Sequence, residues 1–151
     1  MAVDRSYIAD NNAQRARLRA LVDRLSDQDL ARPLSAGWTV AGVLAHLAFW
    51  DQRVLVLLEH WGRSGPGATP PRMHPDDVDW INDAGKALCL ALPPGAAARL
   101  AVTTADAVDQ KVAALSDDLV TANAAAGNPI NLGRAQHRRE HLDEIERALR
   151  G

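Results

Sequence analysis

The residues best suited to chemistry in this chain are histidines, and two of them stand four positions apart. His137 and His141 lie in the segment QHRREHLDEI, whose apolar spacing predicts a helix. Four residues of α-helix turn about 400° and rise about 6 Å, so both side chains project from nearly the same face. Two imidazoles at this spacing are a common way for one helix to bind one metal ion.

The surroundings of this histidine pair allow two interpretations. Ile145 and Leu149 continue the same stripe, so the stripe should face the core, where two unpartnered imidazoles would be costly. Alternatively, the pair lies at a semi-exposed helix end among Arg134, Arg138 and Arg139 and is simply solvated. The pair alone does not decide between a metal site and this alternative.

A third histidine favours the metal interpretation. His46 lies in TVAGVLAHLAFWDQRV, the most apolar predicted helix, where a lone histidine would be expected to bond a backbone carbonyl. However, His46 lies about two turns into its helix, and the histidine pair lies near the start of another. If these two ends are adjacent, three imidazoles converge, and three nitrogens with an open position are typical of a catalytic metal site.

The other two histidines are not expected to join this site. His60 follows His46 by 14 residues, about 21 Å along the helix axis, and is expected at the surface. His74 lies in the Pro-rich stretch GRSGPGATPPRMHP, where it would either cover the site or be solvated, and the solvated position is favoured.

The same segment also matches a protease motif. His137, Glu140 and His141 match the inverted zinc-protease motif H-x-x-E-H. That class takes a further acidic ligand from well downstream, whereas only ten residues follow His141. We therefore interpret Glu140 as a surface residue or as a partner that orients an imidazole.

Other catalytic patterns are missing from the sequence. It has no Gly-rich phosphate loop after a strand and no G-x-S-x-G motif. The single cysteine, Cys89, excludes an internal disulfide and looks like a small buried hydrophobe. The four tryptophans, including Trp61 and Trp80, are expected in core or helix-end packing; Trp38 and Trp50, which flank His46, would alternatively wall a ligand pocket.

The apolar spacing predicts an all-α protein. We expect helices over about 3–25, 40–61, 76–92, 96–115 and 134–149, with long connections at 62–75 and 121–133. Thr39 is the expected N-cap of the second helix, and Leu100 is expected to face inward on the fourth. This pattern predicts a four-helix bundle with one additional short helix and long crossover loops, in a single domain over residues 1–151.

Composition excludes several classes of partner. The chain has 17 basic and 19 acidic residues, a net charge of −2, which argues against a general nucleic-acid binder. No signal peptide or membrane-spanning run is evident, so we expect a cytoplasmic protein with a small-molecule substrate and neither nucleic acid nor membrane as partner.

Several of these segments resemble one known family. The run from Gly37-Trp38-Thr39-Val40 through Leu44-Ala45-His46-Leu47 to Trp50-Asp51, the segment 77–82 and the final H-x-x-x-H-L-x-x-I helix are similar to the DinB-like superfamily. The branch that the chain resembles most is the N-terminal domain of mycothiol-dependent maleylpyruvate isomerases. The further C-terminal domain of those isomerases has no counterpart here, so isomerase activity itself is not part of the expectation.

The resemblance implies a four-helix bundle in which His46, His137 and His141 hold a divalent metal. It also implies a homodimer and thiol-transfer chemistry with a low-molecular-weight thiol such as mycothiol or bacillithiol. Zn²⁺ is the ion that three imidazoles favour, with Ni²⁺ as the alternative. The competing hypothesis is a non-catalytic bundle that binds and sequesters a toxic small molecule, as some relatives of this fold do without a metal.

Overall fold

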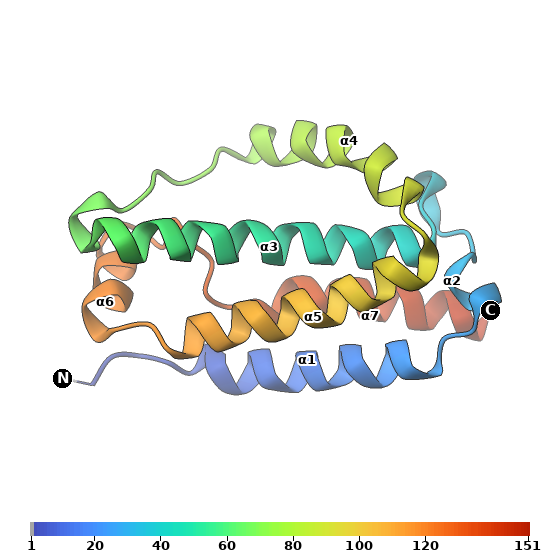
Figure 1. Ribbon diagram of the computed structural model, residues 1–151, viewed down its shortest axis with the longest axis horizontal. Coiled ribbons are helices and arrows are strands. Elements are labelled where there is room, and N and C mark those ends of the chain that lie inside the picture. Colours follow the sequence, from blue (N-terminus) through green and yellow to red (C-terminus); the bar gives the residue numbers. More distant parts are fainter. Residues whose placement is uncertain (1) are drawn as a thin grey trace.

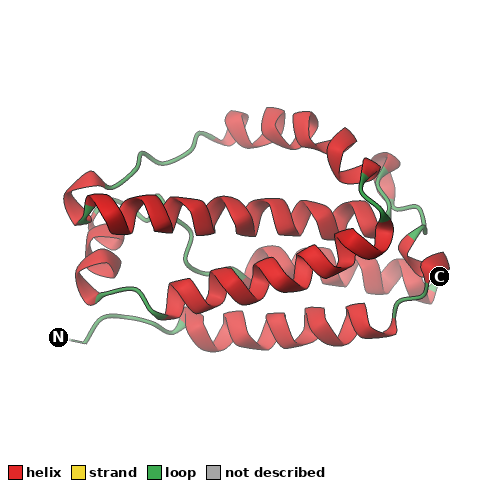
Figure 2. Ribbon diagram, viewed as in Figure 1, coloured by secondary structure: helices red, strands yellow, loops and turns green. Residues whose placement is uncertain are grey.

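The computed structural model describes residues 2–151, and over that range it consists of helices and loops without a strand (Figures 1 and 2). Four long helices form a bundle: α1 (Tyr7–Arg24), α3 (Val40–Ser64), α5 (Pro94–Ala113) and α7 (Ala135–Arg150). A fifth helix, α4 (Pro75–Ala91), lies outside the bundle along α3. Two short helices and two 3-10 turns complete the chain: α2 (Asp27–Leu30), α6 (Asp117–Ala125), η1 (Ser35–Gly37) and η2 (Pro66–Ala68). The predicted all-α bundle is confirmed.

Helix α3 is the element against which α4, α5 and α7 pack. It begins where Thr39 Oγ1 accepts a hydrogen bond from Gly42 N at 3.0 Å, as its N-cap pattern predicts. It continues through Gly62, three residues beyond its predicted end, and stops at Gly65, whose φ of 85° suits glycine. The resulting 25-residue rod holds His46 two turns from its start.

The core consists of two apolar clusters with a charged layer between them. On α3, Leu47 belongs to the first cluster and Val54 to the second. Asp51 lies between them and is 2% exposed, and Arg138 of α7, at the same layer, is 0% exposed. Charged groups are rarely buried this fully unless they are paired. Asp51 and Arg138 are therefore expected to have buried partners of opposite charge.

The connection predicted over 121–133 is wrong in part, because helix α6 occupies its first third. Ser116 Oγ caps this helix by accepting a hydrogen bond from Leu119 N at 3.3 Å. Asn123 then closes the loop that follows, since its side chain accepts from Ile130 N at 3.1 Å and donates to Ile130 O at 2.9 Å. The sequence of this helix is dominated by alanine and polar residues, so it lacks the apolar stripe that a periodicity search requires.

Two side chains lie at the surface instead of in the expected places, which were the core for Leu100 and the core or a helix end for Trp80. Leu100 of α5 is 41% exposed, and Trp80 of α4 is 58% exposed. The core face of α5 is built mainly from alanine and valine, with Ala97, Ala101 and Ala105 almost fully buried, so the larger Leu100 points outward. Helix α4 matches the helix predicted over 76–92 to within one residue at each end, but it contains no buried residue. It covers the bundle as an outer layer rather than contributing to its core.

Helix α3 is the one described helix long and apolar enough to cross a membrane by length and composition alone. Its most apolar stretch is 56% buried inside the molecule. Burial of this kind is typical of the central helix of a soluble bundle, because the apolar faces are covered by neighbouring helices.

Candidate metal centre

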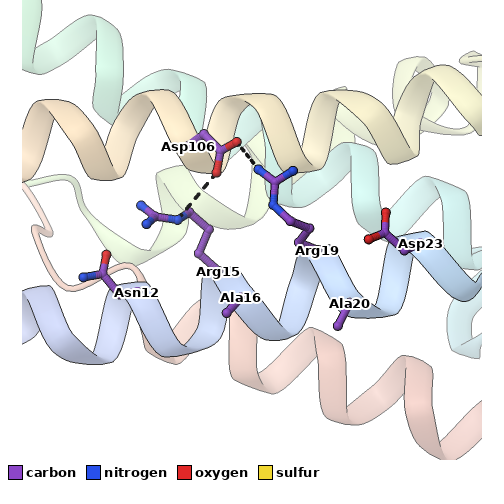
Figure 3. A pocket seen from close by; sticks show the side chains of 7 residues that line it. All are labelled: Asn12, Arg15, Ala16, Arg19, Ala20, Asp23 and Asp106. Carbon is purple, nitrogen blue, oxygen red and sulfur yellow. Dashed lines mark hydrogen bonds and ion pairs between the residues drawn. The ribbon is translucent and has the colours of Figure 1, made fainter.

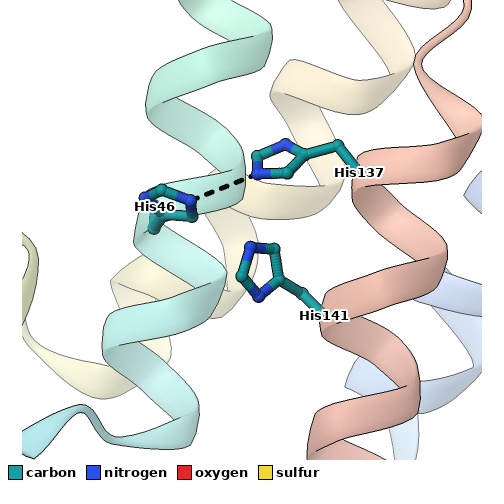
Figure 4. Close-up of side chains that lie close together, drawn as sticks. All are labelled: His46, His137 and His141. Carbon is teal, nitrogen blue, oxygen red and sulfur yellow. Dashed lines mark hydrogen bonds between the residues drawn. The ribbon is translucent and has the colours of Figure 1, made fainter. Parts of the chain in front are cut away.

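Three imidazoles converge between α3 and α7, although His46 is 91 residues from His137 in sequence. The Nε2 atoms of these two histidines are 3.2 Å apart. One ring nitrogen each from His46, His137 and His141 can be chosen so that all three lie within 4.8 Å of one another. Figure 4 shows the three rings pointing toward a common centre. The structure thus brings together the three residues that the sequence selected.

Burial keeps these histidines neutral near pH 7. Loss of hydration lowers the pKa of His46 to about 4, with a smaller contribution from the nearby His141. Burial, His141 and then His46 lower the pKa of His137 to about 3. The pKa of His141 is also lowered by burial, although Glu144 and Glu140 oppose this. Neutral imidazoles present the lone pairs that a metal ion requires.

The donor set fits a borderline divalent ion. Two imidazole nitrogens at about 2.0–2.1 Å from one tetrahedral ion would be about 3.3 Å apart, close to the 3.2 Å between the Nε2 atoms of His46 and His137. The set contains no thiolate or carboxylate, which leaves the site uncharged before an ion binds. Three imidazoles of this kind suit Zn²⁺, Ni²⁺ or another ion of intermediate softness.

The charged layer fixes α7 against α3 and α5 at the level of the histidines. Arg138, the residue after His137, donates to both oxygens of Asp109 at 2.7 and 2.8 Å, and to Asp51 Oδ2 at 3.2 Å. Arg134 Nε donates to the other oxygen of Asp51 at 2.9 Å. The start of α7 is therefore not the semi-exposed helix end of the alternative interpretation, because Arg134 and Arg138 are buried. Their planar, multidentate bonds restrict both rotation and sliding of α7.

A residue of α1 caps the start of α7. Asn11 is 2% exposed, and its Oδ1 accepts hydrogen bonds from Arg134 N at 2.7 Å and Ala135 N at 3.1 Å. Its Nδ2 donates to Leu132 O at 2.9 Å. The first backbone N–H groups of a helix usually bond to a side chain of the residue just before the helix, whereas here Asn11 of another helix accepts from them. Because His137 is the third residue of α7, this cap also fixes the helical turn that carries His137.

Sequence reasoning missed Asn11, Asp51 and Asp109. Asp51 carried a usable signal, because it is the one acidic residue within the apolar part of α3 and therefore needed a buried partner. Asn11 and Asp109 lie in polar or mixed stretches of α1 and α5, where nothing in the pattern distinguishes a buried polar residue from an exposed one.

Two cavities flank the three histidines. The first, of about 660 Å³, is bordered by Trp50, Arg53 and the loop before α7, together with His46 and His137. The second, of about 550 Å³, is bordered by Trp38, Lys86 and three acidic side chains, together with all three histidines. Helix α4 contributes Asn82 to both. The candidate centre is therefore open on two sides.

The tryptophans and Glu140 occupy distinct positions around the centre. Trp38 packs edge-on against His46, with ring centroids 5.6 Å apart, in the second cavity. Trp50 lies in the first cavity, and its Nε1 donates to Asn82 Oδ1 at 2.8 Å. Glu140 lines the second cavity but accepts a hydrogen bond from Gln136 rather than from an imidazole. The carboxylate within ion-pair distance of one of the three converging imidazoles is that of Glu144, 4.0 Å from His141 Nδ1.

The remaining candidate residues lie outside the centre. His60 is exposed and contacts Arg63, as its position on α3 predicts. His74 is exposed and caps α4, since its Nδ1 accepts from Asp76 N at 3.2 Å. Cys89 is half-buried, and burial raises the pKa of its thiol, which disfavours a reactive thiolate.

A third depression lies between α1 and α5 (Figure 3). Both of its arginines already pair with Asp106: Arg15 Nε is 3.5 Å from this carboxylate, and Arg19 bonds it as well. Arg15 also contacts the buried Asp109 at 3.2 Å. These ion pairs satisfy the arginines that border the depression, so it presents no unpaired arginine to a ligand.

Comparison with known proteins places the chain in a family. No curated protein and no solved structure gave a match. A model of the DinB superfamily matches residues 11–144, a span that includes all three converging histidines and the charged layer. The chain belongs to the DinB superfamily.

Proposed function

We propose that the chain is a divalent-metal-dependent enzyme with His46, His137 and His141 as the metal ligands. The observation that carries this proposal is the convergence of three neutral imidazoles on two helices that buried ion pairs hold together. The flanking cavities leave room for a further ligand and a substrate. Zn²⁺ is the proposed ion, and Ni²⁺ is the alternative that the same donors would accept.

The proposed reaction is thiol transfer from a low-molecular-weight thiol, such as mycothiol, to an electrophilic small molecule. A divalent ion at the three histidines would lower the pKa of a coordinated thiol and so favour the nucleophilic thiolate at neutral pH. The chain supplies no activated nucleophile of its own, because its only cysteine is half-buried with a raised pKa. An external thiol therefore completes the chemistry, and water in its place would make the protein a hydrolase.

The surrounding residues have defined tasks in this proposal. Trp38 shields one side of His46 from water. Arg138 keeps α7 in register with α3, so that His137 stays opposite His46. Glu144 faces Nδ1 of His141 and favours a proton on that nitrogen, which would leave Nε2 free to bind the ion.

A thiol-conjugation assay tests the activity directly. Purified protein is incubated with mycothiol, bacillithiol or glutathione and chlorodinitrobenzene, before and after chelation and after Zn²⁺ is restored. We expect conjugation that chelation abolishes and Zn²⁺ recovers, and that His60→Ala retains while His137→Ala loses. Tight binding of an electrophile without turnover, unaffected by chelation, would instead support the competing sequestration function.

Two further properties belong to the proposal. The first is a cytoplasmic location, where low-molecular-weight thiols are reduced and abundant. The second is a homodimer, supported by exposed leucines near the α4–α5 corner: Leu88 is 73% exposed and Leu92 is 37% exposed. Sedimentation equilibrium tests the dimer, and a single species with the 16.3 kDa mass of one chain would contradict it.

A further inference from the structure

The two cavities beside the histidines differ in charge. Three arginines border the first cavity, and no Asp or Glu is among the described residues that line it. The second cavity has three carboxylates, from Asp83, Glu140 and Glu144, against a single lysine. A ligand that reaches the histidines would therefore meet a positive potential on one side and a negative potential on the other.

Arg53 is a half-buried and unneutralised charge of the first cavity. No carboxylate within the described residues lies within salt-bridge distance of its guanidinium, which sits 5.7 Å from the centroid of the Trp50 ring. Burial lowers the pKa of Arg53, and repulsion from Arg134 lowers it further. Arg134 itself is neutralised by Asp51 at 2.9 Å. No neighbouring carboxylate thus neutralises the positive potential of the Arg53 guanidinium in the cavity.

The neutral polar groups around Arg53 are also arranged as donors. Asn82 Oδ1 accepts from Trp50 Nε1, which leaves its NH₂ group for another partner. Asn128 Oδ1 accepts from Asn123 Nδ2 at 3.4 Å, so the NH₂ group of Asn128 is likewise available for another partner. Both amides line the cavity, together with the exposed guanidinium of Arg72. A ligand that satisfies these groups must supply acceptors.

We propose that the first cavity is a subsite for an anionic group, a carboxylate or a phosphate, with Arg53 as its principal contact. This inference rests on the proposed function, because it defines the class of small molecule that the metal centre would act on. Arg53 follows His46 by seven residues, which places both on one face of α3 about 10 Å apart in rise. The ligand would therefore carry its anionic group about 10 Å from the atom that reacts at the histidines.

The test uses metal-free protein, so that no ion can bind the probe. Succinate and inorganic phosphate are titrated separately into the chelator-treated protein and followed by amide chemical shifts. We expect at least one of them to bind and to shift amides of α3 and the loop before α7. Arg53→Gln should raise the dissociation constant about tenfold, because a charge-assisted bond is lost, and Arg53→Lys should recover part of the affinity.

Two control variants separate this subsite from general charge effects. Arg63→Gln removes an exposed arginine of the same helix, and Lys86→Gln removes the single lysine of the second cavity. Both should leave the dissociation constant unchanged. Preference for succinate identifies a carboxylate subsite, and preference for phosphate identifies a phosphate subsite. Absence of binding by both anions, or binding equally tight in Arg53→Gln, overturns the proposal.

Failure of this inference can be distinguished from failure of the metal site. The zinc content of Arg53→Gln should equal that of wild type, since Arg53 does not belong to the three converging histidines. Zinc bound without any anion binding would leave the metal centre intact and remove the subsite. Anion binding that depends on Arg53, in a protein that does not bind zinc, would support the anion subsite and contradict the metal centre.

Discussion

Arg138 donates two hydrogen bonds to Asp109, at 2.7 and 2.8 Å, in a part of the bundle where neither side chain meets solvent. This pair connects α7 to α5, and a third bond from Arg138 to Asp51 connects α7 to α3. The residue before Arg138 is His137, and Asp51 follows His46 by five positions. The ion pairs and the histidines therefore form adjacent layers of one structural unit.

Removal of Arg138 should destabilise the protein strongly. In Arg138→Met, the carboxylate of Asp109 keeps only its contact with Arg15, so a buried charge is left largely unpaired. We expect a loss of about 3–5 kcal/mol in the free energy of unfolding, measured by urea denaturation. Arg139→Met, at the exposed neighbouring position, should change it by less than about 0.5 kcal/mol. Equal small losses in both variants would show that the ion pairs are dispensable.

Loss of the cap on α7 should weaken both stability and metal affinity. Asn11→Ala leaves the backbone N–H groups of Arg134 and Ala135 without their acceptor. We expect a cost of about 1–2 kcal/mol in unfolding free energy and weaker Zn²⁺ binding, because His137 lies in the turn that would fray. The matched control is Asn12→Ala, whose side chain is exposed. Zn²⁺ affinity unchanged in Asn11→Ala would contradict a positioning role for the cap.

The metal-free protein should lose stability as the pH falls below about 6.5. The unfolded chain binds protons at its histidines near pH 6.5, whereas the folded pKa of His46 is about 4 and that of His137 is about 3. The folded state therefore gains stability above pH 6.5 and loses it progressively as the pH falls toward these lower values, by an amount on the order of a few kcal/mol.

Urea denaturation between pH 7.5 and pH 4 measures this dependence. The double variant His46→Gln, His137→Gln should show a shallower slope over the same range, since the titrating groups are gone. His60→Gln should retain the wild-type slope, because this side chain is exposed and separate from the cluster. Slopes that coincide for the wild type and the double variant would show that the buried histidines do not drive the acid sensitivity.

The hydrogen bond between Trp50 and Asn82 should hold α4 over the site. Helix α4 has no buried residue, and among the described residues this 2.8 Å bond is its one side-chain hydrogen bond to α3. Trp50→Phe should speed amide hydrogen exchange throughout α4, with about 1 kcal/mol lost in local opening. Trp80→Phe is the control, because the Nε1 of Trp80 bonds only within α4. Equal exchange rates in the two variants would contradict the attachment.

The predictions from sequence succeeded where the chemistry lay in regular helical spacing. The positions of His46, His137 and His141 within their helices follow from counting residues per turn, and their convergence required only that two helix ends be neighbours. The all-α bundle, predicted from apolar spacing, and the DinB resemblance, based in part on these histidines, are confirmed.

The predictions failed where burial depends on tertiary context. Arg134 and Arg138 look like solvated helix residues in the sequence, and only their carboxylate partners on α3 and α5 make burial favourable. Leu100 looks like a core residue, but alanines already fill the face of α5 that meets the bundle. One-dimensional periodicity does not encode which partner a polar residue will meet.

The central claim is that His46, His137 and His141 form a metal centre, and elemental mass spectrometry of tag-free protein tests it most directly. We predict about one equivalent of a divalent ion, Zn²⁺ in the first instance, in the wild type and in the His60→Ala control. His46→Ala and His137→Ala should each retain little metal while remaining folded by circular dichroism. Wild-type protein that holds no metal after reconstitution and dialysis, or His46→Ala that holds as much as wild type, would contradict the account.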